Sequence, residues 1–263
     1  MALPAPGPGS TAVVTGASSG IGAAMARALA ERGHGVTLVA RSEDRLRALA
    51  EELSGAHGVR AEAVACDVTD PGARDRLEAE VERLGLRVDV LVNNAGFGTY
   101  KPFADTPRER VLEEVRVNTE AVADLTARWL PGMVERGAGA VLITASTAAF
   151  QPLPGNAIYS AAKSFALTFA EALNHEVKGR GVAVTALCPG PVKSGFQDAS
   201  GAHDFASGLP KPLWRTPEQV AAAGIEGLEH GRRVVVPGAP NRVLATIGRL
   251  SPRTVVLRVM DST

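Results

Sequence analysis

The stretch Ala12-Val13-Val14-Thr15-Gly16-Ala17-Ser18-Ser19-Gly20-Ile21-Gly22 joins a short apolar run to a turn that contains three glycines. A segment rich in Ala and Leu follows through about Arg32 and stops at Gly33, which is typical of a helix that ends at glycine. The stretch therefore predicts a buried strand, a tight turn and a helix, in that order.

Glycines at such a turn allow the backbone to approach a pyrophosphate, which binds at the positive N-terminus of the helix. Three glycines alone are weak support, because glycines also serve ordinary turns. Here they follow a strand and open a helix, the context in which the pattern indicates nucleotide binding. We therefore predict a dinucleotide site at this turn.

The rest of the chain repeats the alternation of strand and helix. Strands that are apolar throughout and separated by helices indicate a parallel sheet covered on both faces. We expect a Rossmann-type, doubly wound α/β fold in which ligands bind at the carboxyl ends of the strands. The expected strands after the first are 36–40, 60–66, 88–92, 140–144, 182–187 and 233–236, and the expected helices are 43–53, 71–84, 107–135, 157–178 and one from 216.

The chain shows no internal repeat and no linker that would divide it, so we expect one domain over residues 11–238. Residues 1–10 are expected to form a disordered tail. The long connection 191–215 is expected to be a substrate loop. Residues 239–263 are expected to form a helical extension that packs on the domain or on a partner subunit. Loose membrane contact is the weaker alternative.

Composition excludes several classes of function. The 28 basic and 28 acidic residues cancel, so overall charge favours neither nucleic acid nor an anionic membrane. Cys66 and Cys188 form no disulfide framework, and the five histidines have no ligand spacing, so we predict no metal. The N-terminus lacks the pattern of a signal peptide, and no apolar run approaches the roughly 18 residues that span a bilayer. A cytoplasmic location without stable membrane insertion is expected.

The end of the second strand bears on the choice of cofactor. An acidic residue there would bind the 2′-hydroxyl of NAD, whereas a nearby arginine accommodates the 2′-phosphate of NADP. This chain has Leu38-Val39-Ala40-Arg41, with no carboxylate at the strand end. A solvated surface arginine is the alternative interpretation, but the missing acid favours NADP(H) over NAD(H).

Tyr159 and Lys163 are four residues apart on the expected helix 157–178 and therefore share one face. A free phenol has a pKa of about 10, and a nearby positive charge favours the phenolate. We expect Lys163 to lower the pKa of Tyr159, which would make the phenol a general acid or base, while Ser146 binds a substrate oxygen. Chance also produces such a pair, so the rest of the chain must support it.

The motifs together resemble the short-chain dehydrogenase/reductases, of the single-domain type with about 250 residues. The resemblance covers residues 11–238, and its motifs occur in the order and spacing of that family. They are Thr15-Gly16-(x)3-Gly20-Ile21-Gly22, Asn93-Asn94-Ala95-Gly96, Asn118, Ser146, Tyr159-(x)3-Lys163 and Pro189-Gly190.

The resemblance implies a role for each matching position. Asn118, Ser146, Tyr159 and Lys163 would form the catalytic tetrad, with Asn118 holding a water that links Lys163 to solvent. Lys163 would also bind the nicotinamide ribose. Other implied cofactor contacts are Gly16, Ser18, Ser19, Gly20, Ile21 and Gly22 at the pyrophosphate, Asp67 and Val68 at the adenine, Asn94, Ala95 and Gly96 at the ribose, and Pro189, Gly190, Val192 and Ser194 at the nicotinamide amide.

Two of these positions carry a qualification. The family more often has threonine at the position of Ser194, and the hydroxyl group is kept. Asp67 could instead cap the turn before Pro71.

The implied reaction is hydride transfer between NADPH and a ketone, 3-oxoacyl-like or other apolar carbonyl, or the reverse on a secondary alcohol. Phe97, Phe150, Leu153, Phe196 and Trp214 would form an apolar pocket, although each could be a packing residue. A homo-oligomer, dimer or tetramer, is implied through the helices 107–135 and 157–178. A non-catalytic NADP-binding sensor and a structural protein are the alternatives, but a sensor would be expected to lack Tyr159 or Lys163, and both are present.

Overall fold

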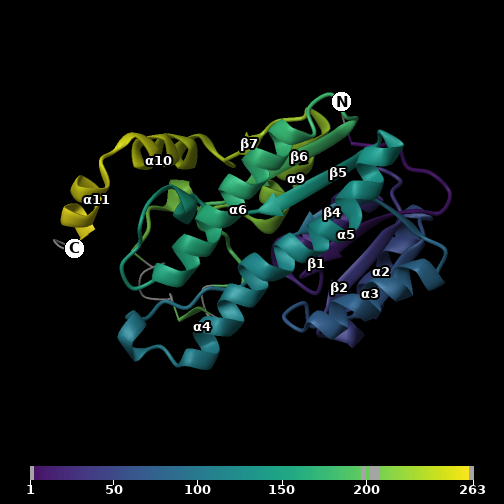
Figure 1. The fold of residues 1–263 in the computed structure, drawn as a ribbon, viewed down its shortest axis with the longest axis horizontal. Coiled ribbons are helices and arrows are strands. Elements are labelled where there is room, and N and C mark those ends of the chain that lie inside the picture. Colours follow the sequence, from purple (N-terminus) through teal and green to yellow (C-terminus); the bar gives the residue numbers. More distant parts are fainter. Residues whose placement is uncertain (1–2, 197–199, 202–207, 261–263) are drawn as a thin grey trace.

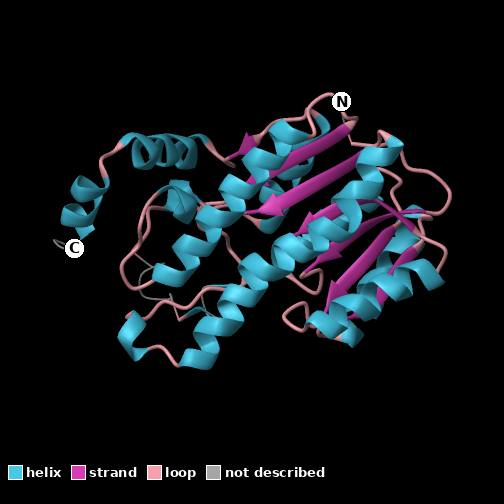
Figure 2. Ribbon diagram, viewed as in Figure 1, coloured by secondary structure: helices cyan, strands magenta, loops and turns pink. Residues whose placement is uncertain are grey.

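The computed structural model describes residues 3–196, 200–201 and 208–260, and its centre is a parallel sheet of seven strands (Figures 1 and 2). The strand order is β3-β2-β1-β4-β5-β6-β7, so the predicted Rossmann-type fold is confirmed. The strands are β1 (Ser10–Thr15), β2 (Val36–Ala40), β3 (Ala61–Ala65), β4 (Arg87–Asn93), β5 (Gly139–Thr144), β6 (Val182–Leu187) and β7 (Val234–Val235).

Helices cover both faces of the sheet, because the strand residues are apolar on both sides. In β1, Ala12 and Val14 pack in one core and Val13 packs in the other. The first core is covered by α1 (Gly20–Ala30), α2 (Glu43–His57) and α9 (Pro217–Glu229). The second is covered by α3 (Pro71–Arg83), α5 (Ala121–Arg136) and α6 (Ala157–Glu176).

The strand order reverses between β1 and β4, which are neighbours in the sheet although β2 and β3 separate them in the chain. The segments that leave β1 and β4 therefore run to opposite sides and leave a crevice at the carboxyl ends of the strands. This topology determines where the site lies.

The N-terminal end of the chain contains more structure than the sequence analysis predicts. Ser10, which was assigned to the disordered tail, is buried as the first residue of β1, and its Oγ accepts a hydrogen bond from the Gly7 N–H at 3.0 Å. Leu3 packs against the core. The C-terminal extension consists of α10 (Ala239–Leu250) and α11 (Arg253–Met260), which project from the body of the molecule on the left of Figure 1.

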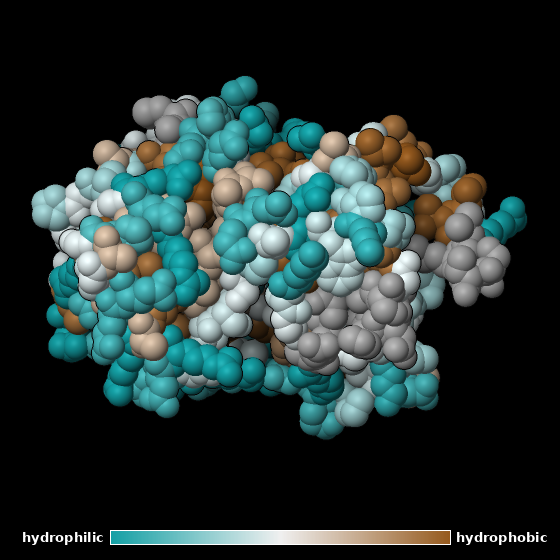
Figure 3. All heavy atoms as spheres, turned by 180° about the vertical axis from the view of Figure 1, so that it is seen from behind, coloured by the Kyte–Doolittle hydropathy of each residue, from teal (hydrophilic) through white to brown (hydrophobic). Residues whose placement is uncertain are grey.

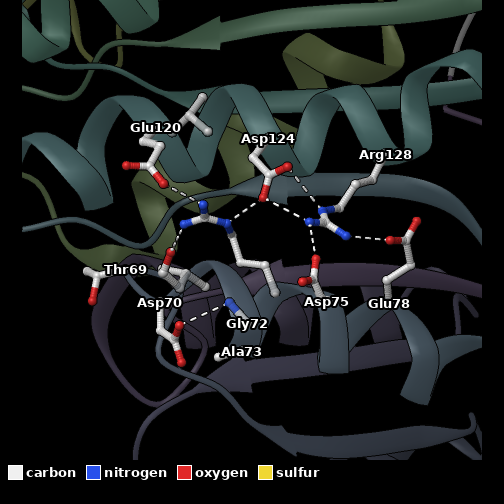
Figure 4. Close-up of polar contacts among 12 residues, drawn as sticks. Thr69, Asp70, Gly72, Ala73, Asp75, Glu78, Glu120, Asp124 and Arg128 are labelled. Carbon is white, nitrogen blue, oxygen red and sulfur yellow. Dashed lines mark hydrogen bonds and ion pairs between the residues drawn. The ribbon is translucent and has the colours of Figure 1, made fainter.

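A buried guanidinium connects α3, α5 and the loop after β3. Arg74 is only 2% exposed. It donates to the Val68 carbonyl oxygen at 2.7 Å, to Glu120 Oε1 at 2.6 Å and to the carboxylate of Asp124. Asp124 also accepts from Arg128, which reaches Asp75 and Glu78 on α3 (Figure 4). The network holds the loop that follows β3 at the edge of the crevice.

Replacing Arg74 with methionine should destabilise the protein by about 2 kcal/mol, because the Val68 carbonyl and two carboxylates lose their buried donor. Glu120 and Asp124 are both partly exposed, so the loss of stability should be smaller than for a fully buried ion pair. Urea unfolding measures the change. Arg76→Met on the same helix is the control, since Arg76 is 73% exposed and pairs with Asp70 only at 3.4 Å; equal losses in the two variants would contradict the assignment.

Candidate active site

A cavity of about 910 Å³ opens at the carboxyl ends of the strands. Residues that follow β1, β2, β3, β4, β5 and β6 all line it, from Gly16 after the first strand to Pro189 after the last of these. Every predicted catalytic or cofactor-binding residue lines this cavity except Gly22 and Asn118, which lie behind its wall.

The turn between β1 and α1 forms the floor at one end. Gly16 has a φ of 68° and Gly20 a φ of 54°, the left-handed region that favours glycine. A Cβ atom on Gly22 would lie 2.2 Å from the Gly16 carbonyl oxygen, so this close packing excludes any side chain. Ser19 precedes α1 without capping it through its side chain, and the N-terminus of α1 lies at the cavity, as an anion site requires.

The part of the cavity that lies beside the end of β2 carries positive charge. Arg41 directly follows β2, and its side chain is 70% exposed. Arg45 on α2 also lines the cavity and was missed by the sequence analysis, although the spacing Arg41-(x)3-Arg45 was visible. Arg41 Nη1 lies 3.8 Å from Glu113 Oε1. The end of β2 therefore presents two guanidinium groups to the cavity.

Asp67 and Val68 line the cavity after β3. Asp67 Oδ1 also accepts hydrogen bonds from the backbone N–H and the hydroxyl of Thr69, at 2.9 and 2.8 Å. It thus caps a turn, the alternative raised from the sequence, while Asp70 caps α3 by accepting from the Gly72 N–H.

Three of the predicted catalytic side chains meet in the middle of the cavity. Ser146 follows β5, and Tyr159 and Lys163 lie on α6. The Lys163 ammonium donates to the Thr144 carbonyl oxygen at 2.9 Å and lies 5.6 Å from the centroid of the Tyr159 ring. The ring of Phe196 lies 5.6 Å from that of Tyr159, centroid to centroid.

Burial shifts the pKa values of Tyr159 and Lys163. It raises the pKa of Tyr159 to about 12, against a hydrogen bond with Ser146 that lowers it. It also lowers the pKa of Lys163 to about 8. The pKa of Tyr159 is therefore raised and not lowered as expected, because burial disfavours the phenolate more than the hydrogen bond with Ser146 favours it. Tyr159 carries its proton at neutral pH and is set to act as an acid.

Asn118 lies behind the cavity wall, in a π-helical turn (Arg116–Glu120) between α4 (Arg108–Val115) and α5. Its amide donates to the carbonyl oxygens of Phe97 at 2.8 Å and Glu114 at 3.0 Å. A Cβ on Gly96 would lie 2.5 Å from Asn118 Oδ1 and 3.3 Å from Lys163 Nζ, so both side chains meet under this glycine. Asn118 is the one member of the tetrad that reaches the site from behind.

Glu114 is a buried carboxyl group that the sequence analysis did not single out. It is 1% exposed, burial raises its pKa, and its charge raises the pKa of both Tyr159 and Lys163. Its Oε1 and Asn118 Oδ1 are among the buried side-chain oxygens that lack a hydrogen-bond partner within the described part of the chain. In the sequence, the only sign of a role for Glu114 is its position four residues before Asn118. The sequence does not show that its side chain is buried.

The substrate end of the cavity is mainly apolar. Phe97, Phe150, Leu153 and Phe196 line it as predicted, whereas Trp214 does not, because its indole turns to the Leu209 carbonyl oxygen at 3.4 Å. Residues 197–199 and 202–207 of the predicted substrate loop lie outside the described residues. Lining residues not foreseen include Tyr100, Gln151, Asn156, Leu209, Leu213 and Leu244. Within the described residues, no group of three His, Cys, Asp or Glu side chains could hold a metal ion.

Comparison with known proteins gives concordant matches. The family model "short chain dehydrogenase" matches residues 10–204. The very-long-chain 3-oxoacyl-CoA reductase of Bos taurus is 38% identical over 185 residues, which are 69% of this chain and 59% of that protein. The chain thus spans about three fifths of the length of this curated relative. An uncharacterised oxidoreductase of Myxococcus xanthus is 42% identical over 70% of this chain and 72% of its own.

Among solved structures, a short-chain dehydrogenase from Sphingobium yanoikuyae in complex with NADPH superposes with a TM-score of 0.82. It is 32% identical to this chain, and the match covers 95% of each protein. The fold, the family match and these relatives together show that the chain belongs to the short-chain dehydrogenase/reductase family of NAD(P)-dependent oxidoreductases.

Proposed function

We propose that the protein is an NADPH-dependent reductase of apolar carbonyl compounds. The observation that carries the proposal is one continuous cavity with two guanidinium groups at one end and Tyr159, Ser146 and Lys163 beside an apolar wall at the other. The alternative of a non-catalytic sensor gains no support, because Tyr159 and Lys163 both line the cavity.

The residues present fit a nicotinamide dinucleotide. The N-terminus of α1 would bind the pyrophosphate, and the close packing of Gly22 on Gly16 leaves the turn open for it. Arg41 and Arg45 would pair with the 2′-phosphate that distinguishes NADP from NAD. Val192 and Ser194, after β6, would bind the nicotinamide amide. When bound, the cofactor supplies the hydride.

The side chains of this protein would supply proton transfer and charge stabilisation. Tyr159, protonated at neutral pH, donates its proton to the carbonyl oxygen of the substrate. The Ser146 hydroxyl donates a hydrogen bond to the same oxygen and stabilises its developing negative charge. Lys163, held by the Thr144 carbonyl oxygen, keeps a positive charge near the phenolate that remains. Asn118 meets Lys163 under Gly96, and the charge of Glu114 favours the ammonium form of Lys163.

Three aromatic rings and several leucines near Tyr159 support an apolar substrate. The names of similar proteins agree: one relative is a very-long-chain 3-oxoacyl-CoA reductase, and a structure with a TM-score of 0.84 and 25% identity is a 7β-hydroxysteroid dehydrogenase. We propose a bulky, apolar ketone or 3-oxoacyl compound. Asn156 Oδ1, a buried oxygen at the cavity, would accept a hydrogen bond from a polar group of that substrate.

The proposal includes a cytoplasmic location and a homo-oligomer formed through the long helices. Apolar side chains exposed on two of these helices support such an interface: Val115 on α4, and Phe165 on α6, whose ring stacks on Phe169 at 5.4 Å.

Replacing Tyr159 with phenylalanine should lower kcat for ketone reduction about 10³-fold, because the acid is lost. Binding of NADPH, followed by its fluorescence, should change little. Tyr100→Phe is the matched control, since it removes the other tyrosine hydroxyl at the cavity. A Tyr159→Phe enzyme that keeps more than about a tenth of kcat would overturn the role of Tyr159.

Replacing Arg41 and Arg45 together with alanine should raise KM for NADPH about 10- to 100-fold and leave KM for NADH nearly unchanged. The effect should shrink at high salt, because both guanidinium groups are solvent-exposed. Arg47→Ala is the control: Arg47 lies on the same helix and pairs with Glu43 away from the cavity. Equal use of NADPH and NADH by the unmodified enzyme would refute the proposed preference.

The two directions of the reaction should respond oppositely to pH. Oxidation of an alcohol needs the phenolate, which is the minor form below the Tyr159 pKa of about 12, so its rate should rise up to about tenfold per pH unit. Reduction needs the phenol and the charge on Lys163, so its rate should fall above about pH 8. Initial rates in both directions test this; a reduction rate that rises from neutral to alkaline pH would contradict it.

A further inference from the structure

The two C-terminal helices carry most of the exposed large apolar side chains of the described chain. They contribute six of nine such residues, and Leu250 reaches 77% exposure. Brown spheres gather over these helices in Figure 3. We call this patch the C-terminal apolar surface: Val243, Leu244, Ile247, Leu250, Val255 and Leu257.

The orientation of α10 is the reverse of an ordinary surface helix. With 3.6 residues per turn, Asn241, Ala245 and Gly248 share one face, and these three are buried against the domain. The opposite face, which points away from the domain, carries Val243, Ile247 and Leu250. A surface helix of a globular protein normally turns its apolar face to the core.

The domain holds α10 firmly in this orientation. Asn241 Nδ2 donates to the carbonyl oxygens of Leu213 at 2.9 Å and Pro237 at 3.0 Å. A Cβ on Gly190 would lie 2.5 Å from Asn241 Oδ1, so the helix packs directly on the segment after β6. The outward apolar face is thus a consequence of specific buried contacts.

The charge of residues 239–260 indicates what kind of partner the C-terminal apolar surface binds. Residues 239–260 contain Arg242, Arg249, Arg253 and Arg258 and not one Asp or Glu. The zero net charge of the whole chain conceals this local excess. On α10 the two arginines lie at the side of the helix, between the buried face and the apolar face. Apolar residues flanked by cations are typical of helices that lie in the interface of an anionic membrane.

A second copy of the chain fits this surface less well. A two-fold interface would bring the same patch of both subunits together, with the arginines of each copy near those of the other, and residues 239–260 supply no Asp or Glu to offset that repulsion. An anionic lipid surface supplies both the apolar environment and the opposite charge. Within the described residues, no helix is long and apolar enough to cross a bilayer. The observations thus favour a helix lying on the surface.

The same helix forms part of the cavity wall. Asn241, Leu244, Ala245 and Gly248 line the cavity, and Leu244 is also half exposed on the apolar surface. The apolar surface is therefore continuous with the substrate end of the cavity.

We infer that α10 and α11 dock the protein reversibly on anionic lipid surfaces and bring the mouth of the cavity to the membrane interface. An apolar substrate dissolved in the lipid would then reach Tyr159 without crossing water. The docking itself does not depend on the reaction, whereas the delivery of substrate rests on the proposed function.

Co-sedimentation of the full-length protein with vesicles tests the docking. Vesicles of phosphatidylcholine with about a third of phosphatidylglycerol should bind it at least about tenfold more tightly than phosphatidylcholine alone, and salt should weaken binding. The double variant Ile247→Ser, Leu250→Ser should bind at least about tenfold more weakly. Phe103→Ser is the control, because Phe103 is 59% exposed but is not part of the C-terminal apolar surface. This variant should bind vesicles as the unmodified protein does.

A second variant separates charge from apolar contact: Arg242→Gln with Arg249→Gln should lose the preference for anionic vesicles and keep the same unfolding midpoint. Absence of binding to anionic vesicles would overturn the inference. So would an Ile247→Ser, Leu250→Ser variant that changes from oligomer to monomer by light scattering while vesicle binding persists, which would assign the surface to a second copy.

Turnover distinguishes a failure of docking from a failure of the proposed reaction. A small water-soluble ketone should be reduced equally by the double variant and the unmodified protein, whereas a long-chain ketone held in vesicles should be reduced more slowly by the variant. Vesicle binding without turnover of either ketone would retain the docking and reject the reductase.

Discussion

The structure depends on the close contact between the turn after β1 and the loop after β4. Thr15 Oγ1 accepts hydrogen bonds from the backbone N–H groups of Asn94 and Ala95 at 2.9 and 3.0 Å, and the Asn94 amide donates to the Thr15 carbonyl oxygen at 3.0 Å. Gly22 lies directly under Gly16, where no side chain fits. These contacts join the two halves of the sheet at the point where its order reverses. Because the chain leaves the two strands in opposite directions there, the crevice that becomes the cavity is unavoidable.

Desolvation dominates the chemistry inside that cavity. The same burial that raises the pKa of Tyr159 to about 12 lowers that of Lys163 to about 8, so the two pKa values are moved apart. A phenol that holds its proton suits the reduction of a carbonyl group better than the oxidation of an alcohol. Glu114 acts against the shift of Lys163, since its charge favours the ammonium form. The protonation of Tyr159 and Lys163 is thereby linked to how deeply α6 and the π-helical turn are packed.

Packing also determines which side chains the C-terminal helices expose on the outside of the protein. On α10, Asn241 and two small residues fill the inner face, and Val243, Ile247 and Leu250 lie on the outer one. One helix thus contributes both to the wall of the cavity and to an exposed apolar surface. Transfer of an apolar compound from lipid to water is unfavourable. For the proposed apolar substrates, such continuity would shorten the path through water between the lipid and the cavity.

Sequence alone determined the features that depend on local pattern: the strands and helices within a few residues, the glycine turn, the Tyr159 and Lys163 pair by its spacing, and the arginine in place of an acid after β2. The full tetrad was implied only by the resemblance to the family. Tertiary structure alone decided those that depend on burial by distant segments. The pKa of Tyr159 rises instead of falling, Glu114 is buried beside Lys163, Trp214 turns away from the cavity, and α10 presents its apolar face outward. The reason is physical: periodicity and spacing are properties of neighbouring residues, whereas desolvation and exposure are set by whatever the rest of the chain packs against them.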